Sequence, residues 1–169
     1  MFSLEIFDQV LNINQWDSVS EFLRCKSERC HIGNFFSFQE AVVFLPLLNK
    51  AAGSFEFFPD DVFEIWHNID IRPQGWHIDQ HEAAAKNGQS FRPICTFVYY
   101  LDVSNDLIGG RLCVFDEFTQ SKHYVEPNRN RLVLFSSGVL HRVEPLEGRR
   151  QSLIINPWRA TILKEAEGL

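Results

Sequence analysis

The second half of the chain is a succession of short β-strand patterns, and this feature most limits the fold. From about Val62 onward, brief apolar and β-branched runs are separated by turn residues such as Arg72-Pro73-Gln74-Gly75 and Ser136-Ser137-Gly138. The predicted strands are Val62–Ile71, Trp76–Asp79, Ile94–Asp102, Arg111–Phe115, Lys122–Val125, Arg131–Phe135, Leu140–Val143 and Gln151–Asn156. These eight short strands, with almost no helix between them, predict a sandwich or jelly roll.

Residues 1–58 follow a different pattern, which predicts mostly helix. Ser18-Val19-Ser20-Glu21 and Ser37-Phe38-Gln39-Glu40 both match the capping box that begins a helix. Pro46 either kinks the second of these helices or begins the next one. Phe2–Leu11 is ambiguous, because its apolar residues fit both a strand and a helix, and we favour a strand at its start.

Length and composition predict one domain. The chain has 169 residues, which is enough for one well-packed domain and too few for two comfortable ones. Hydrophobic residues make up 45% of the sequence, so a large core is expected. We expect a single domain over residues 1–169, with helical support at 1–58 and the β core at 59–169.

Charge and cysteine placement argue for a soluble cytoplasmic protein. The formal net charge of −6 argues against a general binder of nucleic acid or of anionic membranes. No apolar run approaches the roughly 20 residues of a transmembrane helix, and no signal peptide is evident. Cys95 and Cys113 lie within apolar strand patterns, where a buried free thiol is the usual state.

A metal site is predicted by His77, Asp79 and His141. His77 and Asp79 lie two residues apart, so both side chains point to the same face of an extended segment. With His141 they would form a two-histidine, one-carboxylate face, which leaves coordination positions open and suits non-haem Fe(II). Taken alone, the His-x-Asp spacing fits equally well a surface strand with two exposed polar residues.

An arginine expected to face inward on the last strand gives an independent indication of a ligand. Arg150, Ser152, Ile154 and Asn156 alternate onto one face of this strand. A guanidinium on an inward face is costly without a partner, and a bound carboxylate supplies one through two charge-assisted hydrogen bonds. Arg149 competes for this role, but the alternation with Ser152 favours Arg150.

The ordered set of motifs resembles the Fe(II)/2-oxoglutarate-dependent dioxygenases, in their prolyl-4-hydroxylase-like branch. The resemblance spans roughly His67 to Trp158. It rests on the segments His77-x-Asp79, Arg92–Asp102, Gly109–Phe115, Arg131–Ser136, His141-Arg142-Val143-x-Pro145 and Arg150-x-Ser152, in this order.

The resemblance implies a fold and a set of site residues. The expected fold is mainly β, a double-stranded β-helix (a cupin-like jelly roll) of about eight strands, with the N-terminal helices packed on the major sheet. His77, Asp79 and His141 would bind Fe(II). Arg150, Tyr100 and Ser152 would bind the distal carboxylate of the co-substrate 2-oxoglutarate. Leu112 and Ile154 would form apolar walls around its chain. Strand alternation favours Tyr100 over Tyr99 as the tyrosine that faces inward.

The resemblance also implies a reaction. Such an enzyme consumes 2-oxoglutarate and O2, releases succinate and CO2, and hydroxylates an unactivated C–H bond. The carboxylate of Asp79 favours hydroxylation, because related halogenases have a small residue there. The substrate would be a peptidyl residue, such as proline, or a small metabolite such as a free amino acid. The nucleic-acid-repairing branch is disfavoured, since it carries a second arginine where this chain has Asn156.

Several assignments stay open at the level of sequence. Trp76 and Trp158 either line the substrate entrance or cap the core, and His67 either contacts substrate or is a structural histidine. Gln80–Arg92, with a predicted helical turn inside it, is the first candidate for a loop that closes over the site. The alternative to an enzyme is a non-catalytic β-helix domain that binds metal or 2-oxoglutarate as a sensor or scaffold. The oligomeric state is not indicated.

Overall fold

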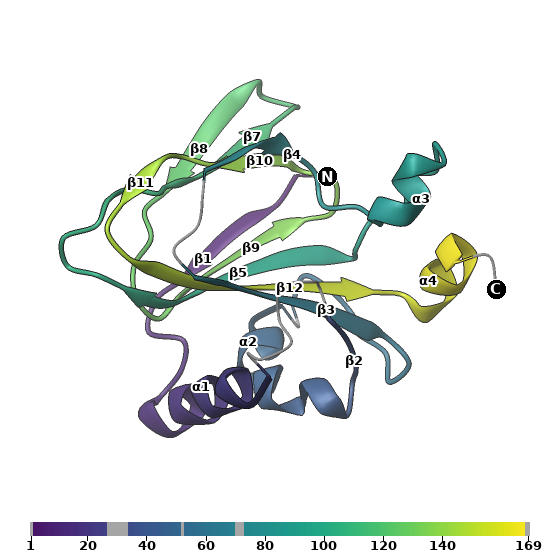
Figure 1. The fold of residues 1–169 in the computed structure, drawn as a ribbon. Coiled ribbons are helices and arrows are strands. Elements are labelled where there is room, and N and C mark those ends of the chain that lie inside the picture. Colours follow the sequence, from purple (N-terminus) through teal and green to yellow (C-terminus); the bar gives the residue numbers. More distant parts are fainter. Residues whose placement is uncertain (1, 27–33, 52, 70–72, 168–169) are drawn as a thin grey trace.

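Two antiparallel β-sheets face each other in the computed structural model, which describes residues 2–26, 34–51, 53–69 and 73–167 (Figure 1). The larger sheet has the strand order β1-β9-β5-β12-β3-β2. Its strands are β1 (Leu4–Phe7), β2 (Asn34–Ser37), β3 (Val62–Ile69), β5 (Cys95–Val103), β9 (Arg131–Ser136) and β12 (Arg150–Trp158). The mixed strand order means that neighbours in the sheet are often far apart in sequence.

The smaller sheet has the order β4-β10-β7-β8. Its strands are β4 (Gln74–His77), β7 (Leu112–Asp116), β8 (Ser121–Val125) and β10 (Leu140–Val143). A separate pair is formed by β6 (Ile108–Gly109) and β11 (Leu146–Glu147). The two facing sheets confirm the predicted double-stranded β-helix. Each of the eight predicted strands is present, with its bounds unchanged at Leu140–Val143 and moved by a few residues at most in the others. The end of the predicted strand Val62–Ile71 lies outside the described residues.

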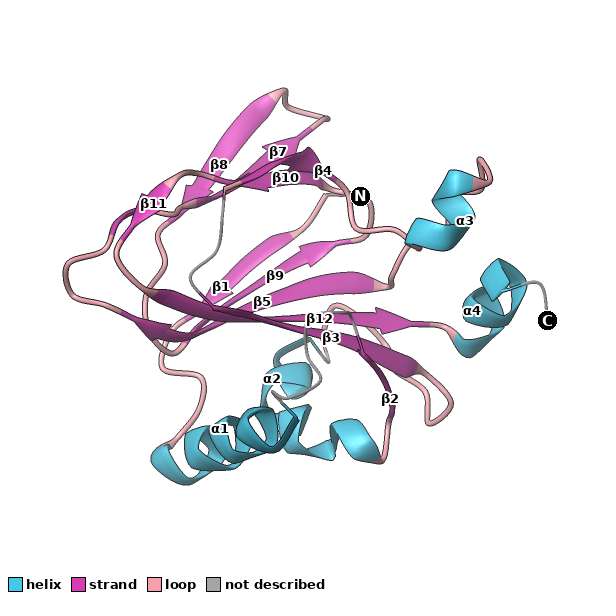
Figure 2. Cartoon of the chain, in the orientation of Figure 1, coloured by secondary structure: helices cyan, strands magenta, loops and turns pink. Residues whose placement is uncertain are grey.

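The N-terminal helices cover the outer face of the larger sheet, as predicted (Figure 2). They comprise α1 (Ile13–Lys26), α2 (Leu45–Leu48) and two 3-10 helices at Glu40–Phe44 and Asn49–Ala51. Phe44 and Leu47 from these helices pack in one core with Phe97 and Leu153 from the sheet. Pro46 lies in the first turn of α2, so it begins a helix and does not kink one.

Two short helices lie at one end of the sandwich, α3 (Glu82–Lys86) and α4 (Ala160–Glu167) (Figure 1). The first confirms the helical turn predicted in this segment. None of the helices described in residues 2–167 combines the length and the apolar sequence needed to span a bilayer.

The start of α1 differs from the prediction. The helix begins at Ile13, because Asn12 and Gln15 form a reciprocal capping box in which each side-chain oxygen accepts the other's backbone N–H at 3.0 Å. Ser18 lies inside the helix, where its hydroxyl donates to the carbonyl of Asn14. The second predicted capping box is confirmed, since the Ser37 N–H and hydroxyl both donate to the Glu40 carboxylate.

Three short strands lie where no strand was predicted. β2 falls in the region read as helical, and β6 and β11 fall between predicted strands. Strands of two to four residues are too short to establish a clear alternation, so their pairing partners determine them.

The strand β5 is buried on both faces, and its alternation divides the interior in two. Phe97 and Tyr99 face the helices, whereas Val98 and Tyr100 face the smaller sheet. The second core is therefore the space between the sheets, and polar residues that point into it must find partners there.

Candidate active site

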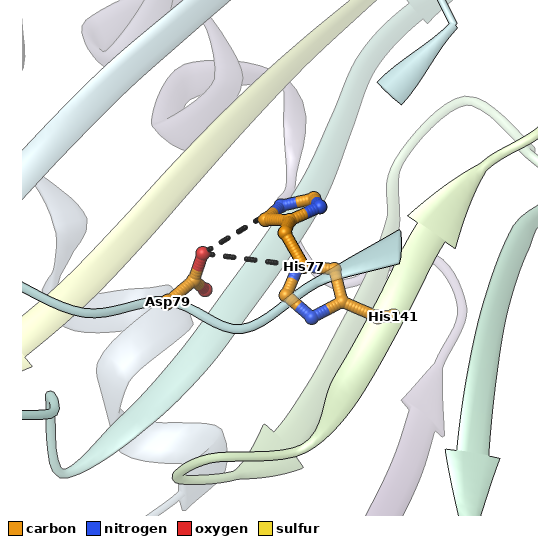
Figure 3. A group of neighbouring side chains, drawn as sticks. All are labelled: His77, Asp79 and His141. Carbon is orange, nitrogen blue, oxygen red and sulfur yellow. Dashed lines mark ion pairs between the residues drawn. The ribbon is translucent and has the colours of Figure 1, made fainter. Parts of the chain in front are cut away.

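His77 and His141 come together because β4 and β10 are neighbours in the smaller sheet. The antiparallel register places the two histidines directly opposite each other, and their ring centroids are 4.2 Å apart. Figure 3 shows both rings on adjacent strands, with Asp79 on the segment that follows β4. Cross-strand pairing thus joins two residues that are far apart in the sequence.

Each imidazole is oriented by the same local contact. His77 Nδ1 lies 2.8 Å from the carbonyl oxygen of Gly75, and His141 Nδ1 lies 2.9 Å from that of Val139. A carbonyl only accepts hydrogen bonds, so both Nδ1 atoms donate. In the neutral rings the Nε2 lone pairs are then free for a metal.

Asp79 completes the group through a hydrogen bond to the larger sheet. Thr96 on β5 donates its hydroxyl to Asp79 Oδ2 at 2.6 Å. The other oxygen, Oδ1, lies 3.9 Å from His77 Nε2 and 3.8 Å from His141 Nε2 (Figure 3). One atom from each side chain falls within 4.8 Å of the others, so the three residues can hold a metal ion.

Burial favours the neutral, metal-binding form of His141. The residue is 5% exposed. This burial lowers the pKa of His141 below the usual value, an effect reinforced by His77 and opposed by Asp79. A donor set of two imidazoles and one carboxylate fits Fe(II) by its chemistry.

Arg150 is buried at the start of β12 without an anionic partner among the described residues. It is 2% exposed, one amino group donates to the Gly110 carbonyl at 2.7 Å, and its Nε has no hydrogen-bond partner. Burial lowers the pKa of Arg150, although a guanidinium stays charged. An anion that enters this space therefore meets a charge with an unused donor.

Tyr100 adds a second unused group beside Arg150. Its hydroxyl is buried without a partner, and burial raises the pKa of Tyr100 to about 12, so the group remains a neutral donor. Ser152 lies directly opposite Tyr100 in the β12–β5 register. The sequence-based choice of Tyr100 over Tyr99 agrees with this geometry, because the hydroxyl of Tyr99 bonds Asn130 instead.

One cavity of about 370 Å³ contains all of these groups. His77, Asp79 and His141 line it together with Arg150, Tyr100 and Ser152, and Leu112 and Ile154 provide apolar wall. The structure thus brings the eight predicted metal and co-substrate residues into one space.

Three further residues predicted as substrate contacts are not in the lining of this cavity. His67 is on the opposite face of β3, because strand side chains alternate, and it lines a separate hollow beside α1 with Trp16. Trp76 is 38% exposed and packs near Phe115 and Arg142. Contact of His67 and Trp76 with substrate stays a prediction, since neither residue lines this cavity.

Trp158 lies behind the cavity wall. It is buried at the end of β12, and its indole N–H donates to the carboxylate of Glu64 at 3.1 Å. Glu64 itself lines the cavity, so Trp158 touches a lining residue.

Sequence reasoning did not name Thr96 or Glu64 as parts of the site, and it placed Asn156 on the inward face of the last strand without giving it a role. Thr96 shares a face of β5 with Tyr100, so alternation could have found it. Glu64 and Asn156 are opposite each other in the β3–β12 register, and this pairing is not visible in the sequence.

Comparisons with known proteins agree with this geometry. The family model of the 2OG-Fe(II) oxygenase superfamily matches residues 66–159. The chain belongs to this superfamily. A comparison with curated proteins finds no match.

Solved structures of prolyl hydroxylases share the fold. A Pseudomonas putida prolyl-4-hydroxylase is 21% identical with a TM-score of 0.63, over 92% of this chain and 87% of that one. A Phytophthora capsici prolyl 4-hydroxylase is 21% identical with a TM-score of 0.62, and the match covers 94% of this chain but 59% of that one. A Trichoplax adhaerens prolyl hydroxylase, solved with a hypoxia inducible factor peptide, is 14% identical with a TM-score of 0.55, over 94% and 84%.

Membership of the superfamily establishes the type of enzyme and its cofactors. The protein is a 2-oxoglutarate-dependent oxygenase that uses Fe(II), 2-oxoglutarate and O2. A non-catalytic sensor or scaffold, the alternative left open by the sequence, is not favoured.

Proposed function

We propose that this oxygenase hydroxylates an unactivated C–H bond of a peptidyl residue or a small metabolite, with release of succinate and CO2. One observation carries the proposal. The free atoms of His77, Asp79 and His141 converge in the same cavity as the unpaired donor of buried Arg150. A metal site and a site for an anionic co-substrate therefore share one space.

In this proposal His77, Asp79 and His141 are the Fe(II) ligands. The carbonyls that bind each Nδ1 keep Nε2 directed at the metal, and Thr96 keeps Oδ1 of Asp79 directed there. When bound, Fe(II) and 2-oxoglutarate supply the activation of O2 for oxidation of the C–H bond.

Arg150, Tyr100 and Ser152 bind the distal carboxylate of 2-oxoglutarate. The guanidinium supplies charge and the hydroxyl of Tyr100 supplies a neutral donor, both without another partner. Leu112 and Ile154 pack against the chain of the co-substrate and exclude water from it.

The remaining features of the protein follow the same proposal. Residues 1–58 support the larger sheet and residues 59–169 form the catalytic core of a single domain. The buried free thiols of Cys95 and Cys113 suit a reducing cytoplasm, and the net charge of −6 does not suit nucleic acid. The peptide bound by the Trichoplax relative is one precedent for a peptidyl substrate.

The test is succinate formation from 2-oxoglutarate in the presence of Fe(II) and O2. We expect His77→Ala and Asp79→Ala to abolish it and Arg150→Ala to raise the 2-oxoglutarate concentration required. His123→Ala, which removes an exposed histidine outside the cavity, is the matched control and should behave as wild type. Binding of 2-oxoglutarate without any succinate would support the non-catalytic alternative.

A further inference from the structure

The cavity has opposite charges on one wall. Arg150, Ser152, Ile154 and Asn156 alternate along the inner face of β12. The seven residues from Arg150 to Asn156 span about 20 Å of strand. Glu64 on β3 is directly opposite Asn156 in the register and lines the same cavity. A cationic end and an anionic end are therefore separated by the length of the strand.

Glu64 is held by neutral donors only. Trp158 Nε1 donates to its carboxylate at 3.1 Å, and the side chains of Asn156 and Trp66 add further hydrogen bonds. No Lys, Arg or His of the described residues forms an ion pair with Glu64. Burial raises the pKa of Glu64, and the nearby Asp79 acts in the same direction. The carboxylate is oriented but its charge is uncompensated.

The side-chain oxygen of Asn156 is a second hydrogen-bond acceptor beside Glu64, and this oxygen has no donor among the described residues. The residue is 4% exposed, and its Oδ1 accepts no hydrogen bond from the described residues. A buried acceptor without a donor is destabilising until a ligand supplies the hydrogen bond. Trp66, opposite Ile154, brings an aromatic ring to the same wall.

We propose that Glu64, Asn156 and Trp66 form a subsite for an ammonium group of the substrate. This proposal rests on the proposed function and names a class of substrate for it. An ammonium group carries several N–H donors and a positive charge. It satisfies Asn156 Oδ1, neutralises Glu64 and interacts favourably with the face of an indole. A carboxylate would be repelled, and an alcohol would bring one donor without charge.

With this subsite, the co-substrate and the substrate are attracted to opposite ends of the cavity by their opposite charges. The anionic co-substrate is attracted to Arg150, and a cationic substrate is attracted to Glu64. Asp79 lies near the Glu64 end, because it is bonded to Thr96 and interacts electrostatically with Glu64. The carbon that is oxidised is therefore expected close to the ammonium group.

A matched pair of probes tests the subsite without knowledge of the true substrate. The protein is loaded with Fe(II) and 2-oxoglutarate under argon, which prevents turnover, and is titrated with n-butylammonium or n-butanol while tryptophan fluorescence is recorded. Hydrogen bonds to charged groups are worth about 1.5–3 kcal/mol, so we expect about tenfold or tighter binding of the ammonium. Glu64→Gln should remove this preference.

Controls separate the subsite from general electrostatics and from misfolding. Glu117→Gln removes the same charge from an exposed turn and should keep the preference. Asn156→Leu removes the unpaired acceptor but leaves Glu64, and it should weaken the binding of n-butylammonium several-fold. If Glu64→Gln does not fold, Asn156→Leu provides the test of the subsite. Equal binding of the two probes by wild type, or wild-type preference in Glu64→Gln or Asn156→Leu, would overturn the subsite.

Competition identifies the source of the ammonium group. Displacement of n-butylammonium by free L-lysine alone supports an amine-bearing small molecule, and displacement by acetyl-Gly-Lys-Gly-amide supports a lysyl side chain. Displacement by neither contradicts the subsite. Succinate formation by a wild type without ammonium preference would defeat this inference alone, whereas an ammonium preference without succinate formation would defeat the proposed hydroxylation alone.

Discussion

At the scale of single residues, one hydrogen bond determines which atom of Asp79 is available to a metal. The Thr96 hydroxyl occupies Oδ2, so Oδ1 faces both imidazoles. Contacts of this kind typically contribute about 10–100-fold to metal affinity. We therefore expect Thr96→Val, which keeps the shape but removes the hydroxyl, to weaken Fe(II) binding by about this factor in an anaerobic titration.

The matched variant for this prediction is Thr96→Ser. It keeps the hydroxyl and should retain most of the affinity. Equal Fe(II) affinity in Thr96→Val and wild type would show that the hydrogen bond does not orient Asp79.

His67 gives a pH prediction at the same scale. Burial lowers the pKa of His67 in the folded protein, and a hydrogen bond with Gln151 only partly opposes this effect. The unfolded chain, with a histidine pKa of about 6.5, then binds the proton more readily. The contribution of His67 to stability is complete above about pH 6.5 and is lost as the pH falls towards its folded-state pKa.

Denaturant unfolding of the metal-free protein at about pH 7.5 and about pH 5.5 measures this effect. The free energy of unfolding should fall more in wild type than in His67→Gln. Both proteins contain His77 and His141, so the comparison cancels their titration. An equal or larger fall in His67→Gln would contradict the prediction.

At the scale of elements, two capping-box patterns compete for the start of α1. Asn12-Ile13-Asn14-Gln15 and Ser18-Val19-Ser20-Glu21 both fit the pattern, and only the second was read from the sequence. Tertiary contacts select the first. The backbone N–H of buried Leu11 donates to Asn130 Oδ1 at 2.9 Å, which fixes the chain immediately before the helix.

This choice predicts unequal effects of two alanine substitutions. Asn12→Ala removes the cap and should reduce the free energy of unfolding by about 1 kcal/mol. Ser18→Ala lies within the helix, where its hydroxyl bonds a carbonyl already used by the helix, and should change stability by less than about 0.5 kcal/mol. Thermal or denaturant unfolding compares them directly, and a larger loss in Ser18→Ala would place the helix start at Ser18.

The longer strands were predictable because their alternation is clear over several residues. β12 shows why, since Leu153 and Ile155 pack towards the helices while Arg150 and Ser152 face the cavity. The same rule places Tyr100 inward. It does not reveal which strand lies beside β12, and so the facing pair of Glu64 and Asn156 could not be predicted.

At the scale of the whole molecule, the candidate metal site joins the two sheets. His77 and His141 belong to the smaller sheet, whereas Asp79 is bonded to Thr96 of the larger one. A ligand that binds only the folded state raises the free energy of unfolding by about 2.7 kcal/mol when its concentration is one hundred times Kd. For a chain of this size we expect a rise in Tm of about 5–10 °C.

Thermal unfolding with Fe(II), and again after addition of a chelator, measures this stabilisation. Asp79→Ala should lose it, because the remaining ligands lie on one sheet only. The same increase in Asp79→Ala would show that metal binds elsewhere.

Three acidic side chains, Glu64, Asp79 and Glu82, line the cavity with a single guanidinium, that of Arg150. Before any ligand binds, this excess of negative charge attracts a divalent cation and repels a dicarboxylate. A bound divalent ion compensates this excess of negative charge and makes the cavity receptive to 2-oxoglutarate, whose own charge then restores the attraction for a cationic substrate. The distribution of charge therefore sets an order of assembly: metal first, co-substrate second, substrate last.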